Sequence, residues 1–280
     1  MSDELSQEQP LTQNNQRVVF NPLRMVVTAV SLCLWIILML LVFGGVRLFA
    51  PAKLPGFFQC FHRGCCRILA LRYQTHGQLC QHRPTLFLSN HISYLDIFVL
   101  GGAIPGHFIA KSEVASWPVL GWLAKVQNTL FFERKGRQVR SQLSVMATHF
   151  NGGGNLILFP EGTSTEGEHV EPFKSSLLQS VEQSQCVVMI QPVTIAYCSY
   201  RGKTMTPQIR DKFAWYGDMP FASHLFGAMA MGPVQISVVF HAPIQLTDFS
   251  ARKDCAFYAW QQVFEGLNQQ LNQSIHSKTD

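Results

Sequence analysis

The chain has 280 residues, of which 47% are hydrophobic and 14% charged, with a formal net charge of +5. An average protein carries about 25% charged residues, so the composition indicates that part of this chain lies in or against lipid. The eight cysteines include no C-x-x-C pair and no Cys/His zinc spacing, which argues against a disulfide framework or a metal site. No nucleic-acid-binding motif accompanies the basic charge, so we expect no nucleic-acid partner.

Residues 1–24 are predominantly polar and are predicted to be a disordered tail. Residues 25–50 are predicted to form a transmembrane anchor, because 25–46 hold no charged side chain and are bounded by Arg24 and Arg47. At 1.5 Å per residue this run spans the roughly 30 Å hydrocarbon core. A cleaved signal peptide is the alternative, although its apolar region would be shorter.

Residues 51–78 form a predicted juxtamembrane basic amphipathic segment. The stretch 51–83 contains five Lys or Arg residues and no Asp or Glu. The positive-inside rule then keeps the rest of the chain on the cytoplasmic side of the membrane. The aromatic and aliphatic residues of this segment fit a helix in the lipid headgroup layer or, equally, a basic helix packed on the following domain.

Residues 79–280 are predicted to be one α/β domain. Short apolar runs at 85–89, 108–110, 129–132, 156–159, 187–197 and 234–240 are typical of strands buried on both faces. Helical patterns lie at 94–100, 119–125, 138–150, 174–183 and 252–275. The alternation predicts a mostly parallel sheet flanked by helices. The stretch 200–232 is the least regular and is predicted to be an insertion or lid.

The loops that follow the strands are the places to look for chemistry, because ligands of open α/β sheets bind beyond the carboxyl ends of the strands. After the first strand come His91 and Asp96, in the motif NHISYLD. A neutral imidazole is a suitable general base near pH 7, and a carboxylate can orient it. The motif Ser93-x-x-Asp96 also resembles a helix capping box. The spacing supports both a catalytic pair and a simple cap.

Two further loops carry polar groups. Arg134, in FFERKGR, offers a guanidinium that could bind a phosphate, although a solvated charge run explains it as well. Glu161, Gly162 and Thr163, in FPEGTS, could cradle an anion or form a plain turn. No G-x-S-x-G, Walker A or G-x-G-x-x-G motif is present, which disfavours serine hydrolases, nucleotide hydrolases and dinucleotide oxidoreductases.

Taken together, NHISYLD, FFER, FPEGTS and the later IQPV resemble, in order and spacing, the four motif blocks of the glycerolipid acyltransferase family. The resemblance extends over residues 86–195. Two positions depart from the pattern: Asn128 stands where a glycine is often found, and FKSS follows the third block where many members have a glycine.

The resemblance implies a role for each block. His91 would be the general base and Asp96 its orienting carboxylate. Arg134 would bind the acceptor phosphate, with Glu161, Gly162 and Thr163 also serving the acceptor. Pro192 would shape the pocket or bind the acyl donor.

The implied activity is that of a 1-acylglycerol-3-phosphate O-acyltransferase of phospholipid biosynthesis, with the 79–280 unit as its acyltransferase domain. The partners would be a lysophospholipid acceptor, an acyl-CoA or acyl carrier protein donor, and membrane lipids. No cofactor is expected. The location would be single-pass in a membrane, as in a bacterial inner membrane, with the catalytic domain on the cytoplasmic side.

Three other functions stay open. The segment FAWYGDMPFASHL resembles a portion of bacterial family members, some of which acylate lyso-ornithine lipid. A non-catalytic lipid-binding protein could retain the fold, although His91 and Asp96 are both present. A lipid hydrolase would use the same base to activate water.

Overall fold

The computed structural model describes residues 18–133 and 139–276. Its main helices are α1 (Pro22–Phe49), α2 (Leu54–Leu69), α3 (Leu95–Ala103), α4 (Leu120–Val126), α5 (Val139–Asn151), α6 (Gln179–Glu182), α7 (Pro207–Arg210), α8 (Phe221–Ala230) and α9 (Arg252–His276). The strands are β1 (Leu71–Gly77), β2 (Thr85–Ser89), β3 (His107–Lys111), β4 (Leu130–Phe132), β5 (Leu156–Leu158), β6 (Met189–Tyr200), β7 (Lys203–Thr204), β8 (Val234–Phe240) and β9 (Ile244–Gln245).

The strands form one sheet in the order β1-β8-β6-β2-β5-β3-β4, with β7 and β9 paired to β6. The pairs from β6 through β4 are parallel, and so is β1 with β8, whereas β6 and β8 are antiparallel. The predicted α/β class with a mostly parallel sheet is therefore confirmed. Strands β2 and β5 are buried along their whole length, as expected for strands covered on both faces.

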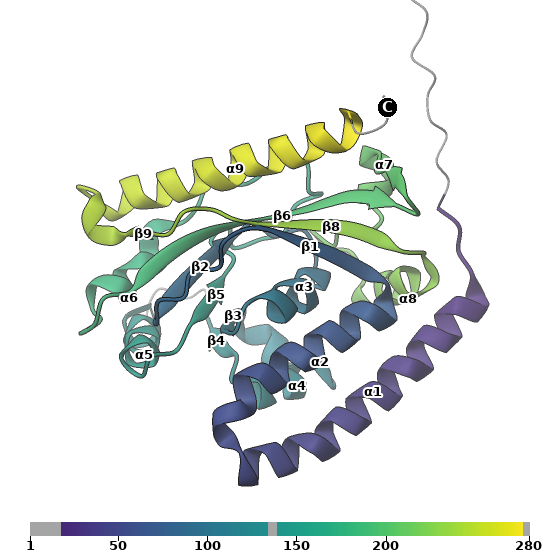
Figure 1. Cartoon of the computed structure of the whole chain (residues 1–280), viewed down its shortest axis with the longest axis horizontal. Coiled ribbons are helices and arrows are strands. Elements are labelled where there is room, and N and C mark those ends of the chain that lie inside the picture. The colour runs from purple at the N-terminus through teal and green to yellow at the C-terminus, as the bar shows by residue number, and fades with distance from the viewer. Residues whose placement is uncertain (1–17, 134–138, 277–280) are drawn as a thin grey trace, which may run out of the picture.

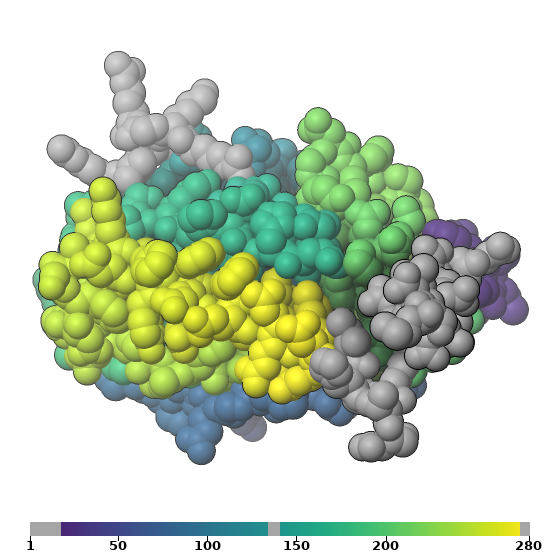
Figure 2. All heavy atoms as spheres, turned by 90° about the horizontal axis from the view of Figure 1, so that it is seen from above, coloured from purple at the N-terminus to yellow at the C-terminus, as the bar shows by residue number. Residues whose placement is uncertain are grey.

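Two hydrophobic cores lie on opposite faces of the sheet. One contains side chains of α2, α3 and α7, and the other contains side chains of α5, α6 and α9. Figure 1 shows α9 along one side of the sheet and α1, α2 and α3 on the opposite side. Figure 2, viewed from the α9 side, shows α9 running across that face. The residues after β2 and β5 consequently emerge between two packed layers.

Most predicted elements match the observed ones to within two or three residues. The predicted helix at 174–183 is instead a 3₁₀ turn, Ser175–Leu178, followed by the short helix α6. The irregular stretch 200–232 contains β7, α7 and α8. Strand β6 is longer than predicted and continues through Cys198 to Tyr200, with a register shift at that point.

Strand β1 was not predicted. Its sequence, LRYQTHG, is mostly polar, and its burial falls from buried Leu71 to exposed residues at its end. It pairs in parallel with β8, beginning with Leu71 opposite Val234. Part of the basic segment at 51–78 therefore contributes an edge strand to the sheet.

Helices α1 and α2 form a tightly packed hairpin. The indole Nε1 of Trp35 donates a 3.1 Å hydrogen bond to the carbonyl of Phe61. Near the loop, the ring of Phe43 lies 5.9 Å from Phe57 and 6.0 Å from Phe58, centroid to centroid. At the other end, the Asn21 amide donates to the carbonyl of Ala230, the last residue of α8. Helix α1 thus packs against α2 and also contacts the end of α8.

Helix α1 is long and apolar enough to cross a membrane, and no other helix in the described ranges passes the same test. Its outward face consists of large hydrophobic side chains exposed to the surroundings: Leu23, Val26, Val27, Val30, Leu34, Ile37, Leu38, Leu41, Val42, Leu48 and Phe49. By contrast, Phe58, Phe61 and Leu69 of α2 are buried. Of the two alternatives for the basic segment, the structure favours a helix packed on the domain.

The close contact between α1 and α2 depends on Gly64. A methyl group at this position would overlap the rigid indole ring of Trp35 on α1. We expect Gly64→Ala to lower the free energy of unfolding by about 1–3 kcal/mol, the usual cost of overpacking. Gly56→Ala in the same helix is the control, since a methyl group there meets no atom within 4 Å. Thermal unfolding in detergent compares them, and equal stability of the two variants would contradict the assignment.

Candidate active site

The candidate site begins where β2 ends and the chain turns into α3. Asn90, the first residue of the turn, is buried and binds both backbone groups of Ile195 in β6, donating to its carbonyl at 2.9 Å and accepting from its amide at 2.8 Å. This side chain substitutes for a further rung of the β2–β6 ladder, which ends at Ser89 and Val193. His91 is therefore delivered to the carboxyl edge of the parallel strands.

Asp96 joins the turn to the helix. Its Oδ2 accepts hydrogen bonds from the amides of Ile92 at 2.7 Å and Ser93 at 3.0 Å, and from Nδ1 of His91 at 2.9 Å. One carboxylate thus both closes the turn before α3 and contacts the imidazole, as each of the two interpretations of the motif requires. The capping box is half formed: the hydroxyl of Ser93 is buried with no hydrogen-bond partner among the described residues.

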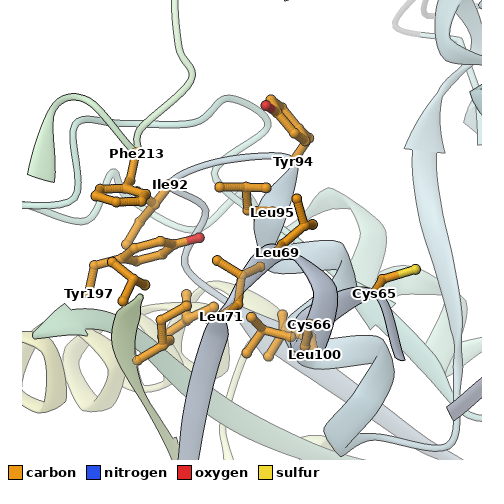
Figure 3. Close-up of a cluster of buried hydrophobic side chains, with 14 of the residues drawn as sticks. Cys65, Cys66, Leu69, Leu71, Ile92, Tyr94, Leu95, Leu100, Tyr197 and Phe213 are labelled. Carbon is orange, nitrogen blue, oxygen red and sulfur yellow. The ribbon is translucent and has the colours of Figure 1, made fainter. Parts of the chain in front are cut away.

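Tyr197 supplies a fourth hydrogen bond to the same carboxylate. Its hydroxyl donates to Oδ1 of Asp96 at 2.9 Å, across 101 positions of sequence, and both side chains are fully buried. Figure 3 shows the Tyr197 ring beside Ile92 and Phe213. The sequence motifs do not include Tyr197. A tyrosine in a strand that is apolar on both faces is nevertheless a usable signal, because buried hydroxyls normally find a partner.

The imidazole of His91 is held in a defined orientation. Its ring stacks on Phe159 with centroids 3.9 Å apart and an angle of 15° between planes, and its side chain keeps 20% of its surface exposed. A carboxylate can only accept, so Nδ1 carries the proton that is donated to Asp96. In the neutral ring, Nε2 is then left with a free lone pair, as a general base requires.

Glu161 fixes the backbone on the other side of His91. Its Oε1 accepts from the amide of His91 at 2.6 Å, and its Oε2 accepts from the amide of Glu171 at 2.7 Å. The side chain is only 2% exposed. Burial raises the pKa of Glu161 to about 8, and the nearby charge of Asp96 acts in the same direction. The hydrogen bond from the His91 amide to Glu161 therefore connects the loop after β2 to the loop after β5.

The remaining predicted residues lie around this centre. Gly162 has φ +74°, and a methyl group there would come within 2.6 Å of the Lys174 ammonium. Thr163 is exposed beside it. Pro192 is buried in β6, in register with Leu88 of β2. Arg134 lies outside the described residues.

The described part of the site contains no group of three or more His, Cys, Asp or Glu residues placed to hold a metal ion. The geometry on its own supplies a base, its orienting carboxylate and a hydrogen-bonded frame. Such a pair can remove a proton from a hydroxyl group that approaches Nε2 of His91.

Known proteins with similar sequences share one chemistry. A family model described as Acyltransferase matches residues 71–196. A lyso-ornithine lipid O-acyltransferase of Rhodobacter capsulatus is 38% identical over 229 residues, which cover 81% of this chain and 79% of that protein. A 1-acyl-sn-glycerol-3-phosphate acyltransferase of Neisseria gonorrhoeae is 32% identical over 157 residues, covering 55% and 58% of the two chains.

A solved structure shares the fold. The crystal structure of the 1-acyl-sn-glycerophosphate acyltransferase PlsC from Thermotoga maritima superposes with a TM-score of 0.62, covering 88% of this chain and 97% of that one. The sequence identity is 20%.

The hydroxyl of Tyr197 gives a first prediction. Tyr197→Phe removes one hydrogen-bond donor from a buried carboxylate, so we expect the free energy of unfolding to fall by about 1.5–3 kcal/mol. Turnover should fall about tenfold, which corresponds to a loss of roughly 1.4 kcal/mol in transition-state stabilisation.

Tyr200→Phe is the matched control for this variant. Tyr200 lies in the same strand, and its buried hydroxyl has no hydrogen-bond partner in the described part of the chain, so its removal should be neutral or stabilising. Chemical unfolding and initial rates are measured on both variants. If Tyr200→Phe is as harmful as Tyr197→Phe, the contact with Asp96 is not the cause.

The raised pKa of Glu161 gives a prediction about pH. In the unfolded chain this carboxyl titrates near 4.5, whereas in the folded protein it titrates near 8. Between these values the unfolded state has released a proton that the folded state retains, so the contribution of Glu161 makes the protein less stable as pH rises. The melting temperature of the wild type should therefore fall relative to that of Glu161→Gln between pH 5 and about 8. A difference that stays constant with pH would show that burial does not raise this pKa.

Proposed function

We propose that this chain, which belongs to the acyltransferase family, transfers a fatty acyl group from an acyl thioester to the free hydroxyl of lyso-ornithine lipid. The observation that carries the chemistry is the His91–Asp96 pair, with Nδ1 bonded to the carboxylate and Nε2 unencumbered at the edge of the sheet. The general statement, that the chain is an acyltransferase of lysolipids, rests on the family itself.

The proposed mechanism needs one base and no covalent acyl-enzyme. Nε2 of His91 takes the proton of the acceptor hydroxyl as that oxygen attacks the thioester carbonyl. A carbon–oxygen bond forms, the carbon–sulfur bond breaks, and the proton passes from His91 to the departing thiolate. Asp96 stabilises the imidazolium that exists between the two proton transfers, and the four hydrogen bonds to Asp96 keep it in place.

The choice of acceptor is supported by the relatives that cover most of the chain. Proteins of Rhodobacter and of other bacteria named lyso-ornithine lipid O-acyltransferase match 65–81% of it. The charges beside the site are consistent with this choice. Glu171, whose amide binds Glu161, forms an ion pair with His169, and Glu166 binds the same ring. Carboxylates at this edge suit the ammonium of an ornithine headgroup better than they suit a phosphate.

Lysophosphatidate is the second candidate acceptor. The relative from Neisseria carries that activity in its name, although it matches a smaller share of the chain. Arg134 would bind the acceptor phosphate in this case, as the family resemblance implies, and Gly162 and Thr163 would also serve the acceptor. Lys174, whose ammonium lies against Gly162, offers a second positive charge.

We propose that the reaction takes place at the cytoplasmic face of a bacterial inner membrane, with α1 as the anchor. The basic residues after α1 favour this side, and both candidate donors, acyl-CoA and acyl carrier protein, are soluble in that compartment. A membrane-bound site also meets its amphiphilic acceptor at high effective concentration.

The proposal predicts diacyl product from purified protein in mixed micelles, with labelled acyl thioester and one acceptor at a time. Lyso-ornithine lipid should be the better acceptor and lysophosphatidate the poorer. His91→Ala should lower the rate by about 10²–10⁴-fold, because it removes the general base. It should also lower the melting temperature, because buried Asp96 loses one of its hydrogen-bond donors.

Other outcomes would identify the alternatives. A faster reaction with lysophosphatidate would retain the mechanism and change the acceptor. Thioester consumption that yields free fatty acid and no diacyl lipid would indicate a hydrolase. Acceptor binding with no turnover of either lipid would indicate a non-catalytic lipid-binding protein.

A further inference from the structure

Arg210 is a buried charged residue that the proposed acyl-transfer mechanism does not use. It is the last residue of α7, and only 4% of its surface is exposed. A guanidinium group is costly to bury unless its donors find acceptors inside the protein. The acceptors of Arg210 therefore show which parts of the chain this buried charge joins.

The guanidinium of Arg210 joins three separate segments. Its Nε donates to the carbonyl of Tyr197 in β6 at 3.2 Å, and its Nη2 donates to the carbonyl of Met205, between β7 and α7, at 3.3 Å. Its Nη1 forms an ion pair with Glu168, in the loop after β5. Because the guanidinium presents its donors in a rigid plane, this one side chain holds β6 and the loop after β5 in a fixed relation.

The loop that Arg210 holds is also the loop that fixes the backbone of His91. Glu161 accepts from the His91 amide at 2.6 Å, and the Thr165 amide donates to the His91 carbonyl at 2.9 Å. Both of these residues precede Glu168 in the loop after β5. The Arg210–Glu168 ion pair therefore fastens the loop that holds His91 from both sides.

Gly167 shows how closely Arg210 packs on this loop. Its φ is +85°, and a methyl group there would lie 3.1 Å from Ile92 and 3.2 Å from Cδ of Arg210. Ile92 follows His91 in the turn before α3. The loop thus passes between this turn and Arg210 with little room for a side chain, so a displaced Arg210 would disturb the turn.

The segment that follows Arg210 contacts the same turn. The Arg210 carbonyl accepts from the amide of Phe213 at 2.9 Å. Two residues later, Trp215 donates its amide to the Ile92 carbonyl at 2.9 Å. The carbonyl of Trp215 accepts from the Ser164 hydroxyl at 2.6 Å. Arg210 is therefore connected to the turn through its backbone as well as through its side chain.

We propose that Arg210 is a positioning residue of the acyl-transfer reaction, which holds the catalytic pair in place through β6 and the loop after β5. Tyr197 is the intermediary on one side, because its hydroxyl donates to Asp96 while its carbonyl accepts from Arg210. Glu168 is the intermediary on the other side. This inference rests on the proposed function, since it assigns a role in that reaction.

Steady-state kinetics in mixed micelles test this role. Arg210→Met keeps an apolar side chain and removes every donor, so kcat should fall by about tenfold, as for the loss of one hydrogen bond to a charged group. The KM values for the lysolipid and for the acyl thioester should change by less than about twofold, because a residue that acts on the catalytic pair does not bind either substrate. A change in KM alone would overturn the proposal.

A double-mutant cycle tests whether Arg210 acts through Tyr197. Two independent tenfold losses, from Arg210→Met and Tyr197→Phe, would multiply to about a hundredfold. Because both variants weaken the support of the same carboxylate, the double variant should lose about thirtyfold or less. A larger loss would show that the two residues act independently and would contradict the proposal.

Gly167→Ala tests the same contact even if Arg210→Met is too unstable to purify. Its methyl group would press on Ile92 and Arg210, so kcat should fall by about tenfold. Gly153→Ala is the matched control. Gly153 has φ +74°, and a methyl group there meets no atom within 4 Å, so the control carries similar backbone strain without the contact. Equal kcat values for the two variants would rule the contact out.

Amide hydrogen exchange in detergent gives a readout that needs no turnover. Peptides that contain the amides of His91, Ile92 and Thr165 should exchange faster in Arg210→Met, whereas peptides of α9 should keep the wild-type rate. Equally faster exchange in α9 would indicate a general loss of stability and would overturn the positioning role. Failure of the acyl-transfer proposal is recognised separately, because the wild type would then form no product while the exchange rates still show whether Arg210 holds the turn.

Discussion

The structure around the site depends on a single buried carboxylate. Asp96 has no solvent exposure, and burying an ionised group is costly unless hydrogen bonds replace its water. Here four donors do so: two turn amides, the His91 imidazole and the Tyr197 hydroxyl. Three of these donors come from the turn itself, whereas the fourth comes from β6. The same interaction therefore fixes the turn, the first turn of α3 and the position of β6 relative to β2.

The rigidity of His91 follows from this arrangement and from a second buried acid. Glu161 holds the His91 amide from the loop after β5, and Phe159 from the same loop covers one face of the imidazole. The ring is thus bounded by Asp96 at Nδ1 and by an aromatic face. In the proposed mechanism, a base held in this way loses little entropy when the acceptor hydroxyl arrives, which is how pre-organised sites lower activation barriers. In this geometry Glu161 acts on the position of His91.

The sequence allowed the prediction of the parts that are local. His91 and Asp96 lie within one turn, so their spacing and a capping pattern were enough to place them. The period of the apolar residues and the length of each apolar run located the main strands and helices. Tyr197 and strand β1 depend on partners more than 100 positions away. A tyrosine in an apolar strand looks like a core residue until the β2–β6 register brings it to α3. Strand β1 has the composition of a polar segment and becomes a strand only by pairing with β8. The contact of Glu161 with the His91 amide likewise requires that β5 lie beside β2.

Helix α1, the proposed membrane anchor, is joined to the site by a continuous series of packed helices and is therefore part of the fold. Helix α1 packs on α2, whose buried Cys65, Cys66 and Leu69 lie with Leu95 of α3 in one core, and Asp96 is the next residue along α3. Only one helix layer therefore separates the anchor from the helix that carries the orienting carboxylate. A flexible tether would leave the domain free to turn its site away from the bilayer. A packed hairpin fixes the orientation of the site relative to α1, so the site cannot turn independently of that helix.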